Sequence, residues 1–374
     1  MTSERRRTQV LRVDIDKSPY FERTERAGAV LYEPYNNTYW PVSYGRGQTE
    51  EYRAVTERAV LIDVGVERSV EVRGPDAVRF VDYLCTRKMQ NLKAGRARHT
   101  VVCEPNGEIY CQAMVLLVEE DCVWILHGPV NFLQWANVIA AHTDFDIQIR
   151  QTEVFPLAVQ GPRSYEIMRD LAPEAADITF FRWTRTAMNG VDVIICRSGF
   201  TGAFGYEVFP FDPGQAPRIW DIVVEAGEPH GLLITPMIGP NMERGVTDFR
   251  YGDRLGLTPF EARLERAVDI DKEPFIGREA LRRVQEQGPA RKLAGVRFGS
   301  DAELPALEQH WPIEPLEPRG SLPGVVTRAR SSYYLNEWIG YAVVRSDVEI
   351  GTRLTVRHPH GTVNGELVEL PFME

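Results

Sequence analysis

The sequence predicts an α+β protein whose C-terminal part is a small β-barrel, and three features of the chain support this. Strand-like runs alternate with helical patterns between residues 59 and 288. A unit of strand, Gly-Pro turn and helix occurs twice, at residues 70–84 and 155–171, which indicates an internal pseudo-repeat. From residue 292 onward, short strands are separated by turns that contain Gly or Pro, a pattern typical of a small barrel or sandwich.

Length and turn signals divide the chain into parts. The 374 residues are enough for two or three domains. Residues 1–17 form a polar, arginine-rich lead, and a Gly-Pro pair at 288–289 ends the last expected helix. We therefore expect an α+β region at residues 18–288 and a barrel domain at residues 289–374.

Helices are expected where apolar residues recur at helical spacing between turn signals. In the first copy of the repeat, Asp76 directly precedes such a pattern and offers a side-chain cap for the helix. The expected helices are residues 50–57, 77–84, 131–141, 165–171, 220–226, 240–249 and 278–287.

Strands are expected where apolar and β-branched residues form short runs bounded by turns. Residues 99–104 and 109–118 flank an Asn106-Gly107 turn, and Asn-Gly suits a type I′ hairpin. The Pro- and Asn-containing stretch 32–41 favours turns over helix, and the stretch 304–323 favours a loop. The other expected strands are residues 59–64, 69–72, 123–127, 155–159, 191–196, 206–209, 293–298, 324–329, 339–344, 351–358 and 362–369.

Composition and missing motifs argue against several classes of function. The formal net charge of -10 would repel a nucleic acid or an anionic membrane, and apolar runs such as 113–118 are too short to span a bilayer. The five cysteines form no C-x-x-C pair and no apolar leader precedes them, which favours buried free thiols in the cytoplasm. Because no G-x-G-x-x-G, P-loop or G-x-S-x-G motif occurs, and His358 and His360 are the only close histidine pair, we expect no metal, flavin or nicotinamide cofactor.

A glycine-rich segment at residues 196–209 connects two expected strands. The connection is longer than an ordinary hairpin loop, and its three glycines would let the backbone approach another surface or a flat ligand closely. Arg197 offers a planar cationic group and Glu207 an acceptor carboxylate. The segment is therefore either a clamp for a heterocycle or a hairpin packed under another domain.

Six segments in the same order along the chain resemble the aminomethyltransferase (glycine-cleavage T-protein) superfamily. Residues 198–208 resemble the S-G-Y-T-G-E-x-G-[FY]-E-[IV] region of that superfamily. The other segments are residues 159–162 (L-Q-G-P), 251–253 (Y-G-N-D), 258–262 (T-P-x-E-A), 275–281 (F-I-G-K-E-A-L) and 370–372 (x-P-F). Residues 18–21 and 35–38 add a resemblance to the branch of tetrahydrofolate-dependent dimethylsulfoniopropionate demethylases.

The resemblance implies a fold, a co-substrate and a reaction. The fold is a three-domain cloverleaf with folate in a central channel, in which residues 18–288 form two interleaved folate-binding domains. The demethylase branch moves a methyl group from a sulfonium to N5 of tetrahydrofolate, and relatives do the same with aryl methyl ethers. We therefore expect a cytoplasmic enzyme, monomeric or homodimeric, that binds tetrahydrofolate and a small S-, O- or N-methyl donor. The alternatives are an aminomethyltransferase of the glycine-cleavage type and a non-catalytic folate-binding protein.

The chain departs from the superfamily pattern at two sites. The catalytic-hairpin pattern G-[IL]-x-[DN]-D-x-[IV]-V corresponds to residues 108–115, where Cys111 and Gln112 replace both carboxylates. The helix that supplies a pterin-binding glutamate has Gly245 at that position, and Glu243 or Asp248 would substitute only with a different helix rotation. An amide cannot transfer a proton as an acid does, so these departures disfavour aminomethyl transfer.

Candidate catalytic residues lie on the hairpin that has lost its acids. They are His99, Tyr110 and Gln112, with Arg98 as a substrate-binding candidate. Strand alternation places Tyr110 and Gln112 on one face and Arg98 on the face opposite to His99. Such a cluster would bind an anionic, oxygen-containing methyl donor. The alternative is that His99 and Tyr110 are core residues and Arg98 is a surface charge.

An onium donor would instead need an aromatic cage. The aromatic candidates for substrate binding are Tyr35, Tyr39, Trp40 and Trp183, with Phe200 and Phe204 from the glycine-rich segment. The wall of the folate site implied by the resemblance comprises Arg197, Phe200, Phe204, Tyr206, Glu207, Glu243 and Tyr251. The donor remains open between a sulfonium or betaine and a methoxylated acid.

Overall fold

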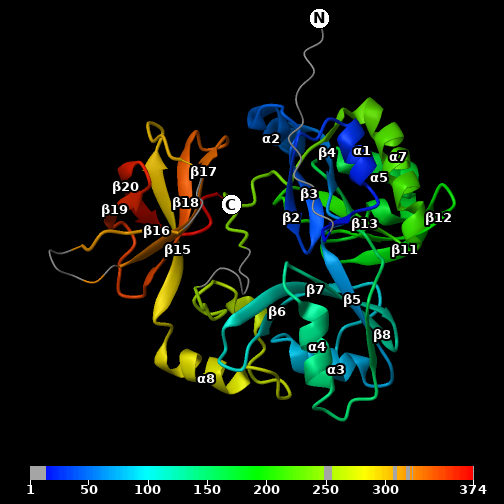
Figure 1. Ribbon diagram of the computed structural model, residues 1–374, viewed down its shortest axis with the longest axis horizontal. Helices are drawn as coiled ribbons and strands as arrows, with labels where there is room; N and C mark the ends of the chain where they lie inside the picture. The colour runs from blue at the N-terminus through cyan, green and yellow to red at the C-terminus, as the bar shows by residue number, and fades with distance from the viewer. Residues whose placement is uncertain (1–13, 248–254, 306–309, 317–320, 322, 374) are drawn as a thin grey trace, which may run out of the picture.

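Three lobes, each built on its own β-sheet, surround the point where the chain ends (Figure 1). The computed structural model describes residues 14–247, 255–305, 310–316, 321 and 323–373. Within these ranges, no helix is both long and apolar enough to cross a bilayer. The predicted mixture of sheets, helices and a C-terminal barrel is confirmed.

The first lobe contains a six-stranded sheet in the order β11-β12-β13-β10-β4-β14, in which only β14 and β4 run parallel. Its strands are β4 (Ala59–Asp63), β10 (Leu157–Gln160), β11 (Trp183–Met188), β12 (Val191–Cys196), β13 (Gly205–Pro210) and β14 (Leu232–Ile234). Its helices are α2 (Gln48–Glu57), α5 (Ser164–Leu171), α6 (Pro173–Ala176) and α7 (Ala216–Gly227). An N-terminal unit of β1 (Asp16–Lys17), α1 (Phe21–Arg26), β2 (Leu31–Tyr35) and β3 (Thr38–Ser43) joins this lobe, because Tyr20 is wholly buried in its core.

The second lobe is inserted into the first. The chain leaves the first sheet after β4, builds a five-stranded sheet in the order β6-β7-β8-β5-β9, and returns with β10. The strands are β5 (Arg68–Arg73), β6 (Ala97–Cys103), β7 (Ile109–Glu119), β8 (Cys122–His127) and β9 (Gln148–Gln151), and α3 (Ala77–Leu84) and α4 (Phe132–Ala140) are the helices.

The two strand–turn–helix units both have a glycine with a positive φ directly after the strand. Gly74 follows β5 with φ +139, and Gly161 follows β10 with φ +105. A Cβ atom at either glycine would lie 2.5 Å from a backbone oxygen, that of Asp146 or of Arg58. Both positions therefore require glycine for conformation and for space.

The third lobe is a nearly closed barrel in the order β16-β17-β18-β15-β20-β19. A bridge between Ile313 and Val356 brings its two ends together. The strands are β15 (Arg291–Gly299), β16 (Trp311–Pro312), β17 (Gly324–Ser332), β18 (Glu337–Arg345), β19 (Arg353–His358) and β20 (Gly361–Val368), and α8 (Arg278–Gln287) precedes them.

A buried ion pair ties the segment before α8 to the second lobe. The Lys272 ammonium lies 3.0 Å from the Asp82 carboxylate on α3, and the two side chains are 1% and 3% exposed. All five cysteines are buried, and none of them forms a disulfide, as the sequence predicts.

The predicted helix at residues 240–249 is wrong over its described part. Residues 241–245 form turns, in which an α-helical bond runs from Arg244 N to Pro240 O at 3.0 Å and a 3-10-type bond runs from Gly245 N to Met242 O at 3.1 Å. Gly245 then adopts φ +69, a left-handed conformation that ends the turn. Residues 248 and 249 lie outside the described residues.

Two predictions about local turns are wrong, one for the cap of α3 and one for the type of the β6–β7 turn. The Asp76 side chain does not cap α3 and instead accepts a hydrogen bond from Asp146 N at 3.1 Å. Gly107 has φ +87 but Asn106 does not have a positive φ, so the β6–β7 turn is not type I′. The type I′ signature occurs instead between β2 and β3, where two asparagines at 36–37 have φ of 46 and 58.

Candidate functional site

The glycine-rich segment wraps around one buried amide. Gln160, at the end of β10, accepts a hydrogen bond from Thr201 Oγ1 at 2.8 Å. Its Nε2 donates to the carbonyls of Ser198 and Tyr206 at 3.0 and 3.1 Å. A Cβ at Gly199 would lie 2.1 Å from the Gln160 side chain, so glycine is needed there for close approach. Two segments that carried the family resemblance therefore meet at Gln160.

Arg197 and aromatic rings form an exposed stack at the end of β12. The Arg197 guanidinium carbon lies 3.5 Å from the centroid of Phe204, with Phe180 at 5.9 Å. Arg197 also donates from Nη1 to the Gly205 carbonyl at 3.0 Å. Phe180 and Phe204 are 61% and 37% exposed, which leaves aromatic faces available to a flat ligand.

A buried carboxylate lies behind this stack. Glu207 accepts a hydrogen bond from Ser198 Oγ, and burial raises the pKa of the Glu207 carboxyl. Among the described residues, no hydrogen bond reaches the second oxygen of Glu207. Tyr206, by contrast, is wholly buried and donates to the Ala176 carbonyl at 2.5 Å, so it supports the first-lobe core. Phe200 lies half-buried in the loop.

The hairpin of β6 and β7 brings His99 and Gln112 together. Gln112 Oε1 lies 2.9 Å from His99 Nε2, and Gln112 Nε2 donates to the Thr247 carbonyl at 2.9 Å. Burial, with a smaller contribution from the charge of Arg87, lowers the pKa of His99, whereas the bond to Gln112 acts in the opposite direction. The pair therefore lies at the contact between the second lobe and the segment at 239–247.

Tyr110 does not share a face with Gln112. A β-bulge shifts the β6–β7 register between Val102 and Cys103, and Tyr110 is the extra residue. Its ring stacks on Trp135 at 5.1 Å inside the second-lobe core. The simple alternation rule therefore fails at this point.

Arg98 is directed away from the pair formed by His99 and Gln112. Its Nη1 donates to Asn91 Oδ1 at 2.5 Å and to the Lys88 carbonyl. This placement matches the expected opposite faces of Arg98 and His99, and it separates Arg98 from the other candidates on the hairpin.

The segment at residues 239–247 contacts all three lobes. Gly202 in the glycine-rich segment has no room for a Cβ, which would lie 2.9 Å from the backbone of Asn241. At the other end, Thr247 receives the bond from Gln112. From the barrel, Tyr341 OH donates to the carbonyls of Met242 and Val246 at 2.9 and 3.0 Å.

Glu243 anchors this segment and is fully buried. It pairs with Arg330 and accepts from Ser332 Oγ at 2.8 Å, both on β17. Tyr52 OH on α2 donates to the same carboxylate at 3.4 Å. Both carboxylate oxygens are therefore used in holding the first lobe and the barrel together. Tyr251 lies outside the described residues.

The aromatic candidates for a cage do not gather in one place. Tyr39 belongs to a ring cluster with Phe21, and Trp183 is a core residue whose indole donates to the Arg96 carbonyl at 3.1 Å. Tyr35 and Trp40 do contact each other, with ring centroids 5.2 Å apart, and the Trp40 indole donates to the Asp63 carbonyl at 3.1 Å. These four residues therefore do not form a single cage.

Several site residues were not predicted from the sequence. Gln160 belongs to the segment 159–162 that resembles the L-Q-G-P motif, and no sequence pattern marks Tyr52, Arg330 or Ser332. The signal for Gln160 was the glycine spacing of the partner loop, because such close approach requires a specific buried neighbour. For the three residues that hold Glu243, no local signal exists, since they lie 87 to 191 positions from it in the sequence.

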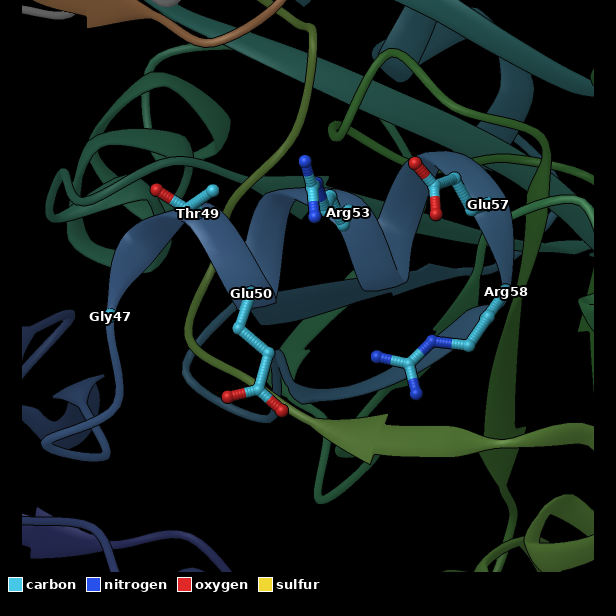
Figure 2. A pocket seen from close by; sticks show the side chains of 6 residues that line it. All are labelled: Gly47, Thr49, Glu50, Arg53, Glu57 and Arg58. Atoms are coloured by element: carbon cyan, nitrogen blue, oxygen red, sulfur yellow. The ribbon is translucent and has the colours of Figure 1, made fainter.

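A shallow hollow of about 530 Å³ lies along α2 and is separate from these groups (Figure 2). Figure 2 shows charged side chains of both signs around it, and no residue predicted for the site lines it. Its lining residues are Gly47, Thr49, Glu50, Arg53, Glu57 and Arg58.

Comparison with known proteins agrees with this arrangement. The family described as GCVT N-terminal domain matches residues 20–272, and the glycine cleavage T-protein C-terminal barrel domain matches residues 291–374. A crystal structure of the glycine cleavage system aminomethyltransferase T from Bartonella henselae superposes with a TM-score of 0.80 at 21% identity. The superposition covers 96% of this chain and 98% of that one, which shows a common fold.

Similar sequences carry two different functional names. Aminomethyltransferases from Halothermothrix orenii and Rubrobacter xylanophilus are 30% and 31% identical. The alignments cover 96% and 97% of this chain, and 99% and 95% of those proteins. A dimethylsulfoniopropionate demethylase from Ruegeria pomeroyi is 29% identical over 93% of this chain and 94% of its own.

Proposed function

Because the chain belongs to the glycine cleavage T-protein family, we propose that it is a folate-dependent transferase that acts as a demethylase. In the proposed reaction, a methyl group moves from a small S-, O- or N-methyl donor to N5 of tetrahydrofolate. The similarity to aminomethyltransferases supports the general class, and the residues of the β6–β7 hairpin support the specific reaction.

The main support for this proposal is that residue 112 is a glutamine. It occupies the position where the family resemblance places a carboxylate, and both ends of its amide are engaged, by His99 and by Thr247. An amide neither donates a proton to departing ammonia nor holds a counter-charge for it. Methyl transfer from a sulfonium needs neither function, because the leaving group is a neutral thioether.

Such a displacement depends mainly on holding the nucleophile, methyl carbon and leaving group in line. Positioning of this kind supplies several kcal/mol of the barrier in favourable cases. An aryl ether would also need a hydrogen-bond donor for its leaving oxygen.

The glycine-rich segment supplies the groups proposed to hold tetrahydrofolate. Phe200 and Phe204 offer aromatic faces beside the pterin ring, with Arg197 stacked behind Phe204. Glu207 would accept hydrogen bonds from the N–H groups of the pterin through its second oxygen. A hydrogen bond from a pterin N–H group would satisfy this second oxygen of the buried carboxylate. Glu243 is assigned a structural role, since Arg330 and Ser332 already use both of its oxygens.

The test is to incubate the protein with tetrahydrofolate and a panel of methyl donors, and to measure 5-methyltetrahydrofolate by chromatography. The panel contains a sulfonium, a betaine and a methoxylated aromatic acid. We expect product with one donor class and loss of folate binding in Glu207→Ala. The proposal fails if no donor yields product and tetrahydrofolate does not bind.

Aminomethyl transfer is the second candidate, because relatives 30% and 31% identical carry that name. It is tested with methylenetetrahydrofolate, ammonia and an aminomethyl-carrier protein. We expect no aminomethyl transfer by the wild type. The matched variant is Gln112→Asp, which restores an acid at this position. Folate binding without either activity would support a non-catalytic folate-binding protein instead.

A further inference from the structure

The hydrogen-bonded chain from Thr247 to His99 determines the orientation of the Gln112 amide. The Thr247 carbonyl can only accept, so the group that faces it at 2.9 Å must be the amino group of Gln112. The carbonyl oxygen of Gln112 is then the atom that faces His99 Nε2 at 2.9 Å. The opposite orientation would place two lone pairs against each other at Thr247.

This orientation also fixes the proton on the imidazole ring. An amide oxygen only accepts, so His99 Nε2 must carry the hydrogen that joins the two groups. A neutral imidazole has one N–H, which leaves Nδ1 with its lone pair. Burial and the neighbouring Arg87 favour the neutral ring. The bond to Gln112 acts against burial and Arg87 on the pKa of the ring, but it determines which ring nitrogen carries the hydrogen.

We propose that Gln112 is a positioning residue that holds His99 as the Nε2–H tautomer, with Nδ1 as the proton acceptor of the site. The hydrogen bonds of Gln112 to Thr247 and to His99 determine this assignment without any ligand. The role of Nδ1 in turnover rests on the proposed function, in which N5 of tetrahydrofolate must lose its proton when it gains a methyl group.

The proposed proton transfer balances in the following way. The N5 lone pair forms the new N–CH₃ bond, and the bond from the methyl carbon to the donor atom breaks with its electron pair on that atom. The N5 proton passes to Nδ1, which turns His99 into an imidazolium. A sulfonium leaves as a neutral thioether, so that the proton goes to water. An aryl ether leaves as a phenoxide, which takes the proton from the imidazolium. Because Gln112 is uncharged, it does not hold the proton on the ring as a carboxylate would.

The tautomer is tested by long-range proton–nitrogen NMR of the histidine rings in the full-length protein. The chain has seven histidines, and the His99→Gln spectrum identifies the signals of His99 by their absence. We expect the Nε2–H pattern in the wild type at pH 8. An Nδ1–H pattern overturns the proposal, and this result needs no variant at position 112.

Two further variants separate the positioning role from general damage. Gln112→Leu removes the acceptor, and we expect its His99 signals to shift to a mixture of tautomers. Gln134→Leu makes the same change at an exposed glutamine that accepts from Asn131 at 2.7 Å, and we expect it to leave the His99 signals unchanged. Unchanged His99 signals in Gln112→Leu would also overturn the proposal.

The measurement distinguishes this proposal from the proposed function. If no methyl donor is used, the demethylase assignment fails while the tautomer result remains. If demethylation occurs and His99 has the Nε2–H pattern, Gln112→Leu should lower kcat at least tenfold with a smaller change in KM, and alter the pH dependence of kcat. A change in KM alone would reject the role of Nδ1 in turnover.

Discussion

Removing the charge of Asp82 should destabilise the second lobe strongly. In Asp82→Asn the side chain keeps its shape, but Lys272 loses the carboxylate 3.0 Å from its ammonium. Lys272 is 1% exposed, so water cannot replace the lost partner. Among the described residues, the ammonium also contacts the Asp82 carbonyl and the ring face of Phe275, 5.1 Å away.

The expected cost follows from the burial of the pair. Breaking a buried ion pair by neutralising one partner costs about 3–5 kcal/mol, because an uncompensated charge remains inside. Asp82 also accepts from the backbone of Gln90 at 3.3 Å and of Met89, and the asparagine oxygen can keep these bonds. We therefore assign the loss to the charge and expect about 3–5 kcal/mol.

The measurement is native-state hydrogen exchange of the amides in α3 and β5–β9, which reports the local free energy of opening. This choice avoids the assumption that a chain with three lobes unfolds in one step. Asp347→Asn is the matched control, because its bidentate pair with Arg345 at 3.0 and 3.2 Å is exposed to solvent, and we expect it to leave the local free energy of opening nearly unchanged. Equal effects of the two substitutions would refute the reasoning.

Three other substitutions give distinct outcomes. Burial raises the pKa of Asp63 from 3.8 to about 6, so between these pH values the unfolded chain binds fewer protons than the folded one, and stability falls as the pH rises. Hydrogen exchange of the β4 amides should therefore show Asp63→Asn gaining up to ~3 kcal/mol in opening free energy over the wild type from pH 4 to 7. A difference between the two proteins that does not change with pH would contradict this. Glu243→Gln removes the charge partner of Arg330, and we expect faster amide exchange in β17 with no change in β5–β9. An equal change of the exchange rates in both sets of strands would argue against Glu243 as the anchor of the segment at 239–247. Arg197→Lys loses planar stacking on Phe204 and should raise the Kd for tetrahydrofolate roughly tenfold by fluorescence titration, whereas unchanged affinity would remove Arg197 from the site.

The parts of the fold predicted best from the sequence are those determined by local chemistry. The helices at 77–84 and 278–287 have their expected bounds, because apolar spacing specifies the first and Gly277 and Gly288 flank the second. The predicted helix at 240–249 is wrong over its described part because the barrel binds carbonyls of that segment and the first lobe binds the Glu243 side chain, and such contacts outweigh intrinsic helix propensity.

The same distinction applies to the candidate site. Pairing of His99 with Gln112 could be anticipated from two strands of one hairpin, since register brings nearby positions together. The bulge that removes Tyr110 from that face has no clear local signature in the sequence. The partner carbonyl of Thr247 lies 135 residues from Gln112, and only the assembled lobes bring the two together.

The insertion of the second lobe into the first has a consequence for the order of folding during synthesis. β4 ends at residue 63, but its neighbours β10 and β14 begin only at residues 157 and 232. All strands of the second sheet have been synthesised by residue 151. Because a strand cannot pair before its partner exists, the inserted sheet can close while β4 still waits as an unpaired edge. We expect the lobe in the middle of the chain to fold on the ribosome before the lobe with which the chain begins.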